Sequence, residues 1–281
     1  MLRALPRTRS PTPLARGLLS HAQAAWGEGF AILFSMNGTW TTLEIVGKTA
    51  EIYGLPGGKQ PRFGVLHLHG VGLETLRDNP SFTRLFDNLG LACVCPHGQR
   101  SWWGDRVCRE FDETLTPERH LIDNVLPFFA QRWGLRPRRI ALQGISMGGQ
   151  GALRLAFKRP DLFPVVAAIA PAIEYHELYG QGLLIDEMYD SKEQCRQDTA
   201  PLHVHPSQYP PHIFFCVDPD DGFWYRGSDR LHEKLSALGI AHEYDLTTQA
   251  GRHSWTYFNH MAERTERFIV AGLEQESRRL L

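Results

Sequence analysis

The feature that most limits the fold of this chain is an abrupt change from a strand pattern to a helix pattern in mid-sequence. The segment RRIALQG (138–144) predicts a short buried strand, and MGGQGALRLAFKR (147–159) repeats its apolar residues at helical spacing. Only Ile145 and Ser146 separate the two patterns. A strand that passes so directly into a helix is typical of a sheet covered by helices.

The same alternation of strands and helices runs along most of the chain. The segments TTLEIV (41–46) and TAEIYGLP (49–56) predict an opening antiparallel pair. Further strands are expected at 63–70, 91–96, 138–144, 165–171, 212–218 and 241–247, and helices at 81–89, 118–134, 147–159, 228–238 and near the C-terminus. This order predicts the α/β class, with a mostly parallel central sheet and helices on both faces. Ligands of such sheets bind at the carboxyl ends of the strands.

The domain organisation is simple. Residues 36–281 predict one domain, in which a mixed segment at about 174–208, after the sixth expected strand, predicts a small cap-like insertion. The first 27 residues hold four arginines and no acid. We interpret residues 1–35 as a tail outside the fold, or as an extended start with initiation at Met36. An organellar presequence is the less favoured alternative.

The bulk composition excludes several classes of function. There are 30 Lys and Arg against 31 Asp and Glu, a formal net charge of -1, which argues against a nucleic-acid or anionic-membrane partner. No apolar run reaches the ~18 residues of a membrane span. The odd number of cysteines argues against a disulfide scaffold: Cys93, Cys95, Cys108, Cys195 and Cys216. We therefore expect a cytoplasmic protein.

Histidines are frequent, but their spacing does not predict a metal site. The pairs His67/His69 and His203/His205 lack a convincing third ligand nearby. We expect no metal and no cofactor.

The strand–helix junction is also the strongest chemical motif. Its run GISMGG (144–149) contains G-x-S-x-G between an expected strand and an expected helix, the context of a nucleophile elbow. Ser146 would lie at a helix N-terminus, where the helix dipole and free amides favour a developing anion. The alternative is a plain glycine-rich turn.

A serine nucleophile needs a base, and His253 is the best candidate. It lies in GRHSW (251–255), between the last expected strand and the last expected helix, where the base loop of such a fold should fall. His260 lies well inside that helix, and His242 opens a strand. A surface-loop histidine is the alternative.

The acid that orients the histidine should follow the strand HIFFCV (212–217). Asp218, Asp220 and Asp221 all lie there, and spacing alone does not choose among them. Because Pro219 indicates an immediate turn, Asp218 could serve that turn.

The oxyanion of an acyl-transfer reaction needs hydrogen-bond donors. One should be the amide of Met147, directly after the serine. The other should come from the loop HGVG (69–72), with Val71 favoured and Gly72 next. His69 is expected to be structural.

Together these segments resemble the esterase D family, which includes the S-formylglutathione hydrolases. The resemblance rests on GISMGGQGALRLAFKRPDLF, HLHGVG, GRHSWTYF and DDGF. It implies the α/β-hydrolase fold. It also implies that the acid is the aspartate two residues before a phenylalanine, which is Asp221. The sequence departs from the hydrolases of formylglutathione in two places, since the loop GVGLET (70–75) holds no cysteine and SWWGD (101–105) differs. These departures favour a broader carboxylesterase.

Aromatic residues in loops after the expected strands suggest an apolar acyl, aryl or sugar-binding wall. They are Trp102, Trp103, Trp224 and Trp255, and packing in the core is the alternative for some of them.

The sequence thus predicts a serine hydrolase that cleaves small soluble carboxylic esters through Ser146, His253 and Asp221 by way of an acyl-enzyme. The alternatives are a thioesterase of the S-formylglutathione hydrolase type, an acyltransferase or peptidase with the same triad, and a degenerate hydrolase that only binds. We expect a small-molecule ester as partner, and no nucleic acid or membrane. The sequence is compatible with a homodimer.

Overall fold

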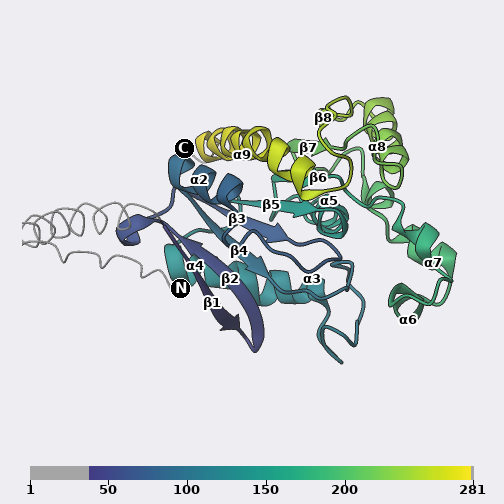
Figure 1. Cartoon of the computed structure of the whole chain (residues 1–281), viewed down its shortest axis with the longest axis horizontal. Helices are drawn as coiled ribbons and strands as arrows, with labels where there is room; N and C mark the ends of the chain where they lie inside the picture. Colours follow the sequence, from purple (N-terminus) through teal and green to yellow (C-terminus); the bar gives the residue numbers. More distant parts are fainter. Residues whose placement is uncertain (1–37, 280–281) are drawn as a thin grey trace, which may run out of the picture. The chain divides into compact units, whose positions relative to one another are not determined.

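The computed structural model describes residues 38–279, and these contain an eight-stranded sheet (Figure 1). The strands lie in the order β1-β2-β4-β3-β5-β6-β7-β8. Their bounds are β1 Thr39–Ile45, β2 Lys48–Gly54, β3 Phe63–Leu68, β4 Leu91–Pro96, β5 Ile140–Ile145, β6 Val165–Ile169, β7 His212–Cys216 and β8 Glu243–Asp245. The basic segment predicted as a tail, residues 1–35, lies outside the described residues.

The pairing of the strands confirms the predicted sheet. β1 and β2 are antiparallel to each other, and β2 is antiparallel to β4. Every pair from β4 to β8 is parallel. The central strands β3, β4 and β5 are buried along their whole length, as parallel strands covered on both faces require.

Eight α-helices and four 3₁₀- or π-helical turns occupy the described range. The α-helices are α2 Pro80–Leu89, α3 Pro117–His120, α4 Leu126–Trp133, α5 Met147–Lys158, α6 Ile185–Met188, α7 Lys192–Gln197, α8 Tyr225–Ala237 and α9 Trp255–Arg278. The turns are η1 Pro56–Gly58, η2 Leu121–Val125, η3 Tyr175–Leu178 and η4 Ala200–His203. In Figure 1, α2 and α9 lie on one side of the sheet, with α3 and α4 on the other. No helix among residues 38–279 is both long and apolar enough to span a membrane.

Three predicted elements differ most from those observed. The helix expected at 118–134 is interrupted by the π-helical turn η2. Pro127 lies two residues after the end of this turn, and because proline has no N–H it cannot donate to the α-helical ladder. Helix α8 begins at Tyr225 rather than at residue 228, and β8 is limited to three residues.

The segment 174–208 consists of the short helices η3, α6, α7 and η4. An ion pair of 2.6 Å joins Asp198 in this segment to Arg154 of α5, which also pairs with Glu118. The Arg154 side chain is 3% exposed, so its charge is compensated by these carboxylates away from solvent. This network connects the segment to the helix that follows Ser146.

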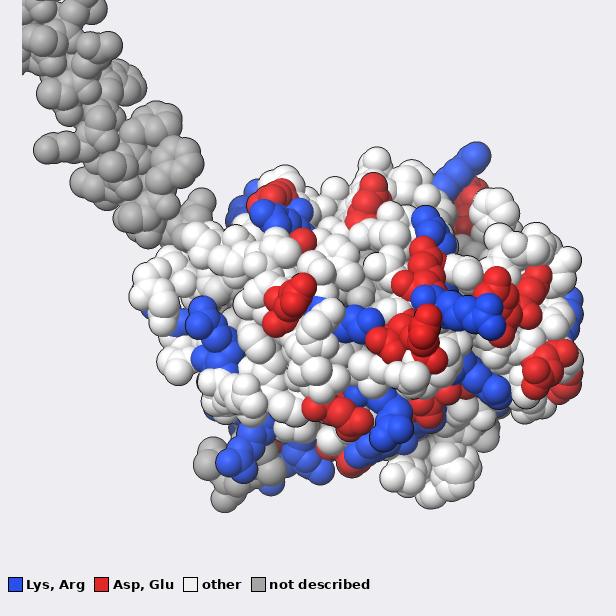
Figure 2. Space-filling view, turned by 90° about the horizontal axis from the view of Figure 1, so that it is seen from below, with Lys and Arg blue, Asp and Glu red and all other residues white. Residues whose placement is uncertain are grey.

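The surface carries no large field of one sign on the face shown in Figure 2. Basic and acidic side chains lie close to one another there, in keeping with the formal net charge of -1.

A buried polar chain joins α9 to the central strands. Gln143 Nε2, on β5, donates to Glu266 Oε1 at 2.7 Å, and Gln143 Oε1 accepts from His67 Nδ1 at 3.2 Å. Burial raises the pKa of Glu266 to about 8 and lowers the pKa of His67 to about 3. Both groups are therefore held neutral. This chain positions α9 against β5, the strand that ends beside Ser146.

The raised pKa of Glu266 predicts a pH-dependent stability. The pKa of a glutamate in an unfolded chain is about 4.3, whereas Glu266 in the folded chain keeps its proton up to about pH 8. The stability of the fold should therefore fall as pH rises through this window. Glu266→Gln should flatten the dependence of the free energy of unfolding on pH. At pH 8 it should raise that free energy by on the order of 2 kcal/mol. Denaturant titrations at several pH values check this. Glu263→Gln, an exposed change on the same helix, is the control, and a wild-type profile flat from pH 5 to about pH 8 would contradict the prediction.

Candidate active site

The turn from β5 into α5 holds Ser146 in a strained backbone conformation. Its φ is 58° and its ψ is -118°, a region that residues with side chains seldom occupy. A methyl group at Gly144 would overlap the carbonyl of Gly148, and one at Gly148 would overlap the carbonyl of Leu68. The two glycines of the motif are therefore required by close backbone contacts.

Neighbouring strands hold the serine backbone in place. The Ser146 amide donates to the carbonyl of Ile169, at the end of β6, at 3.0 Å, and the Ser146 carbonyl accepts from Ala172 at 3.0 Å. Helix α5 begins at Met147, whose amide precedes the first intrahelical hydrogen bond. Ser146 thus lies at the end of the sheet, beside an amide free to bind an anion.

His253 reaches Ser146 from the loop between β8 and α9. Its Nε2 lies 2.9 Å from Ser146 Oγ, and its Nδ1 lies 2.7 Å from Asp221 Oδ2. A carboxylate only accepts, so Nδ1 carries the proton and Nε2 accepts from the serine hydroxyl. The imidazole packs against Phe258 in an edge-to-face arrangement, with ring centroids 5.3 Å apart.

The Asp221 carboxylate is buried and oriented by its own loop. Its side chain is 0% exposed, and Oδ1 accepts from the amides of Phe223 and Trp224 at 3.1 and 3.2 Å. These bonds direct Oδ2 towards His253. His253 is therefore within hydrogen-bond distance of both Ser146 and Asp221, the two residues predicted from the sequence as its partners.

Asp218 holds the loop that carries His253. Its Oδ2 accepts from the amides of Ala250 and Arg252, each at 2.8 Å, and Oδ1 accepts from Asp220 at 2.9 Å. Burial raises the pKa of Asp218, but the backbone amides together outweigh burial and hold the pKa below its usual value. The hydrogen bonds of this carboxylate go to backbone amides and not to the histidine ring, so Asp218 serves as an anchor.

His69 shapes the loop beside the serine. Burial lowers its pKa to about 4, and its Nε2 accepts from the Gly98 amide at 3.0 Å. Its Nδ1 then donates to the carbonyl of Gly70 at 2.8 Å. The carbonyl of His69 accepts from the indole Nε1 of Trp103 at 3.1 Å. His69 and Trp103 therefore hold the loop in position from its buried side.

A cavity of about 200 Å³ opens in front of Ser146 and His253. Besides those two residues it is lined by Gly70, Val71, Gly72, Glu74, Ile145, Ser254, Trp255 and Phe258. Val71, Gly72 and Trp255 were predicted from the sequence. Glu74 and Phe258 were missed, although Glu74 follows the HGVG loop and Phe258 lies near Trp255 in the first turn of α9.

Three of the four predicted substrate-wall tryptophans do not line this cavity. Trp103 is 1% exposed and packs behind the loop. Trp102 is stacked on Tyr175 at 4.5 Å between ring centroids. Trp224 is partly buried at the start of α8. These three tryptophans pack against other residues of the fold, so the structure does not bring them to the wall of this cavity.

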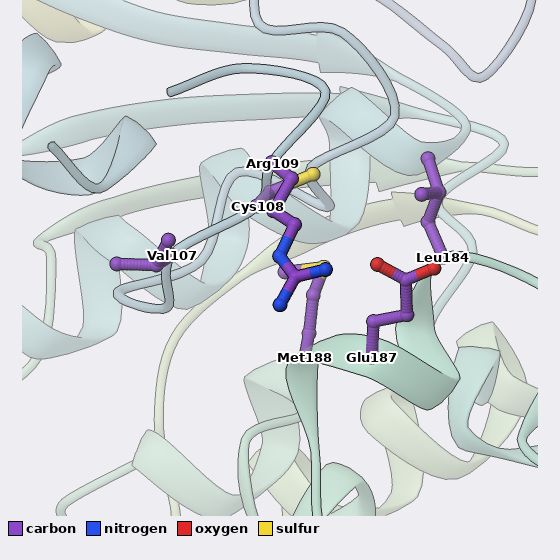
Figure 3. A pocket seen from close by; sticks show the side chains of 6 residues that line it. All are labelled: Val107, Cys108, Arg109, Leu184, Glu187 and Met188. Carbon is purple, nitrogen blue, oxygen red and sulfur yellow. The ribbon is translucent and has the colours of Figure 1, made fainter. Parts of the chain in front are cut away.

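A larger cavity, of about 440 Å³, lies between the loop after β4 and α6. Figure 3 shows Arg109 extending across it towards Met188 and Glu187. Cys108 also lines it, but burial raises the pKa of this thiol, so the reactive thiolate is disfavoured. No group of three or more His, Cys, Asp or Glu among residues 38–279 is arranged to hold a metal ion.

This fold, with its strained serine turn at the end of a parallel strand, is that of an α/β-hydrolase. Residues 91–265 match the family model named Esterase and described as "Putative esterase". The chain belongs to this family, and it is an ester-hydrolysing enzyme.

Solved structures support the fold. An S-formylglutathione hydrolase from Agrobacterium tumefaciens matches with a TM-score of 0.70 and 18% identity, over 85% of this chain and 96% of that chain. A ferulic acid esterase matches with a TM-score of 0.68 and 14% identity, over 84% and 98%. The fluorophosphonate-binding serine hydrolase F of Staphylococcus aureus matches with a TM-score of 0.65 and 16% identity, over 83% and 99%. No curated protein matches the sequence.

The anchoring hydrogen bonds of Asp218 predict a stability effect. Asp218→Asn replaces one accepting oxygen by an NH₂ group that faces backbone amides. It should lower the free energy of unfolding by about 1–3 kcal/mol. Thermal or urea unfolding measures the change, with Asp220→Asn, a more exposed neighbour, as the control. Equal stability of the Asp218 variant and the wild type would contradict the anchoring role.

Proposed function

We propose that this protein is a serine hydrolase that cleaves small soluble carboxylic esters through Ser146, His253 and Asp221. The observation that carries the proposal is the continuous hydrogen-bonded chain from Ser146 Oγ through both imidazole nitrogens to Asp221 Oδ2, with distances of 2.9 and 2.7 Å. Its serine end opens into the cavity in which an ester would bind.

In the first half of the reaction, His253 Nε2 accepts the Ser146 hydroxyl proton as Oγ attacks the ester carbonyl carbon. The carbonyl oxygen becomes an oxyanion. The amide of Met147 donates to it, and the second donor is the amide of Val71 or, next, of Gly72. Asp221 holds the Nδ1 tautomer and stabilises the imidazolium.

The tetrahedral intermediate then collapses. The bond between the carbonyl carbon and the alcohol oxygen breaks, and His253 gives its proton to the leaving alcohol, so that an acyl-Ser146 ester remains. A water molecule loses a proton to His253 and attacks this ester, and the second collapse releases the carboxylic acid. The free serine is regenerated and no cofactor is needed.

The cavity size favours small substrates. Its volume of about 200 Å³ is below the ~300–1,000 Å³ of pockets for drug-sized ligands. A thioesterase is the second candidate, because the same geometry attacks thioesters and a similar solved structure is an S-formylglutathione hydrolase. Turnover of acetyl thioesters against matched oxygen esters separates the two.

The proposed nucleophile predicts selective labelling. A fluorophosphonate probe should modify Ser146 and no other serine, because this hydroxyl is hydrogen-bonded to a base. Ser146→Ala should abolish labelling and lower turnover of p-nitrophenyl acetate by ~10⁴-fold or more. Mass spectrometry of the labelled peptide and steady-state kinetics check this. Turnover at the wild-type rate in Ser146→Ala would refute the mechanism.

The two buried aspartates predict a kinetic contrast. Asp221→Asn keeps the shape of the side chain but no longer favours the required imidazole tautomer, so kcat should fall by ~10²–10⁴-fold. Asp218→Asn is the matched control and should mainly change stability. Both are measured well below the unfolding temperature of each variant. If the kinetic loss follows Asp218, the acid is misassigned.

A further inference from the structure

The cavity beside Ser146 carries a negative charge that the mechanism does not use. Glu74 lines it, and Glu74 Oε2 accepts from the indole Nε1 of Trp255 at 2.5 Å. No lysine or arginine is among its lining residues, and Glu74 has no ion-pair partner within residues 38–279. The side chain is exposed at the mouth of the cavity, so its carboxylate faces any group that enters.

Two other carboxylates of the surrounding loops have side-chain partners. Asp221 is bound to His253. Glu174, after β6, pairs with Arg226 and Arg230 of α8 at 2.7 and 2.5 Å. Among the described residues that line the cavity, Glu74 is thus the only one with a carboxylate.

Aromatic rings complete the same wall. Trp255 and Phe258 line the cavity with Glu74, and their ring centroids are 5.5 Å apart in an edge-to-face arrangement. A carboxylate beside aromatic rings is a suitable environment for an organic cation, because the carboxylate and the ring faces both attract positive charge. The same wall would repel a carboxylate.

We propose that Glu74 is a specificity-determining residue that makes the cavity select esters carrying a positively charged ammonium group over uncharged esters of the same shape. This proposal rests on the proposed function, since it concerns the substrate of the same site. Coulomb attraction over about 6 Å in a largely aqueous medium corresponds to a preference of roughly three- to tenfold.

Glu74 could instead act only as a hydrogen-bond acceptor that holds Trp255. Glu74→Gln separates the two roles, because its amide oxygen still accepts from the indole while the charge is lost. Trp255→Phe is the complement, since it keeps a ring and the Glu74 charge but removes the N–H. Asp78→Asn is the charge-matched control: it removes one negative charge from the same loop, outside the cavity lining.

The experiment compares inhibition by choline and by 3,3-dimethyl-1-butanol, which have nearly the same shape and differ in charge. Each is tested as a competitive inhibitor of p-nitrophenyl acetate hydrolysis at low and high salt. We expect wild type, Asp78→Asn and Trp255→Phe to bind choline about three- to tenfold more tightly than the alcohol, and less so at high salt. In Glu74→Gln the ratio should fall by about threefold or more, to the smaller preference that the aromatic rings alone confer, and its dependence on salt should be lost. Because the ratio is taken within each variant, changes in overall activity cancel.

Equal inhibition by the two compounds in the wild type would overturn the proposal, as would a preference for choline in Glu74→Gln as large as that of the wild type. In both cases the hydrolysis of p-nitrophenyl acetate would leave the proposed function intact. Failure of the wild type to hydrolyse any uncharged ester would instead overturn the proposed function, and this proposal with it.

Discussion

The turn between β5 and α5 depends on two backbone contacts that are too close for any side chain. Gly144 lies against the backbone of Gly148, and Gly148 lies against the carbonyl of Leu68 at the end of β3. These contacts bring the start of α5 onto the edge where parallel strands end. Ser146 must then adopt a positive φ, at a cost of order 1–3 kcal/mol, which hydrogen bonds to Ile169 and Ala172 help to offset.

The base loop depends on a different interaction, between two neighbouring carboxylates with separate tasks. Asp218 binds the amides of Ala250 and Arg252, and so fixes the position of the backbone directly before His253. Asp221 binds the imidazole itself. Both are buried, and each is compensated by N–H donors, because an unpaired carboxylate away from water would be costly. The loop after β7 thus positions the base in two ways: Asp218 holds the backbone next to His253, and Asp221 holds the imidazole ring.

Local patterns predicted much of this arrangement. Apolar periodicity located the strands and most helices, because both faces of a parallel sheet must be buried. The motif around Ser146 was recognisable since its glycines and its strand–helix context are adjacent in the chain. The choice between Asp218 and Asp221 was not local. The turn chemistry of Pro219 favoured an anchoring Asp218, but the hydrogen bond from His253 to Asp221 joins residues 32 positions apart.

The sequence by itself determined the fold class, the position of Ser146 in its turn and the loops that bring His253 and Asp221 to it, because each depends on residues close together in the chain. Only the tertiary structure decided which aromatic rings line the cavity. Trp102 and Trp103, like Trp255, follow an expected strand in the sequence. The first two are nevertheless buried by packing partners from distant segments. Glu74 acquired its contact with Trp255 in the same way, across 181 positions. Whether a side chain faces solvent, core or cavity depends on what the rest of the chain packs against it, and local sequence does not contain that information.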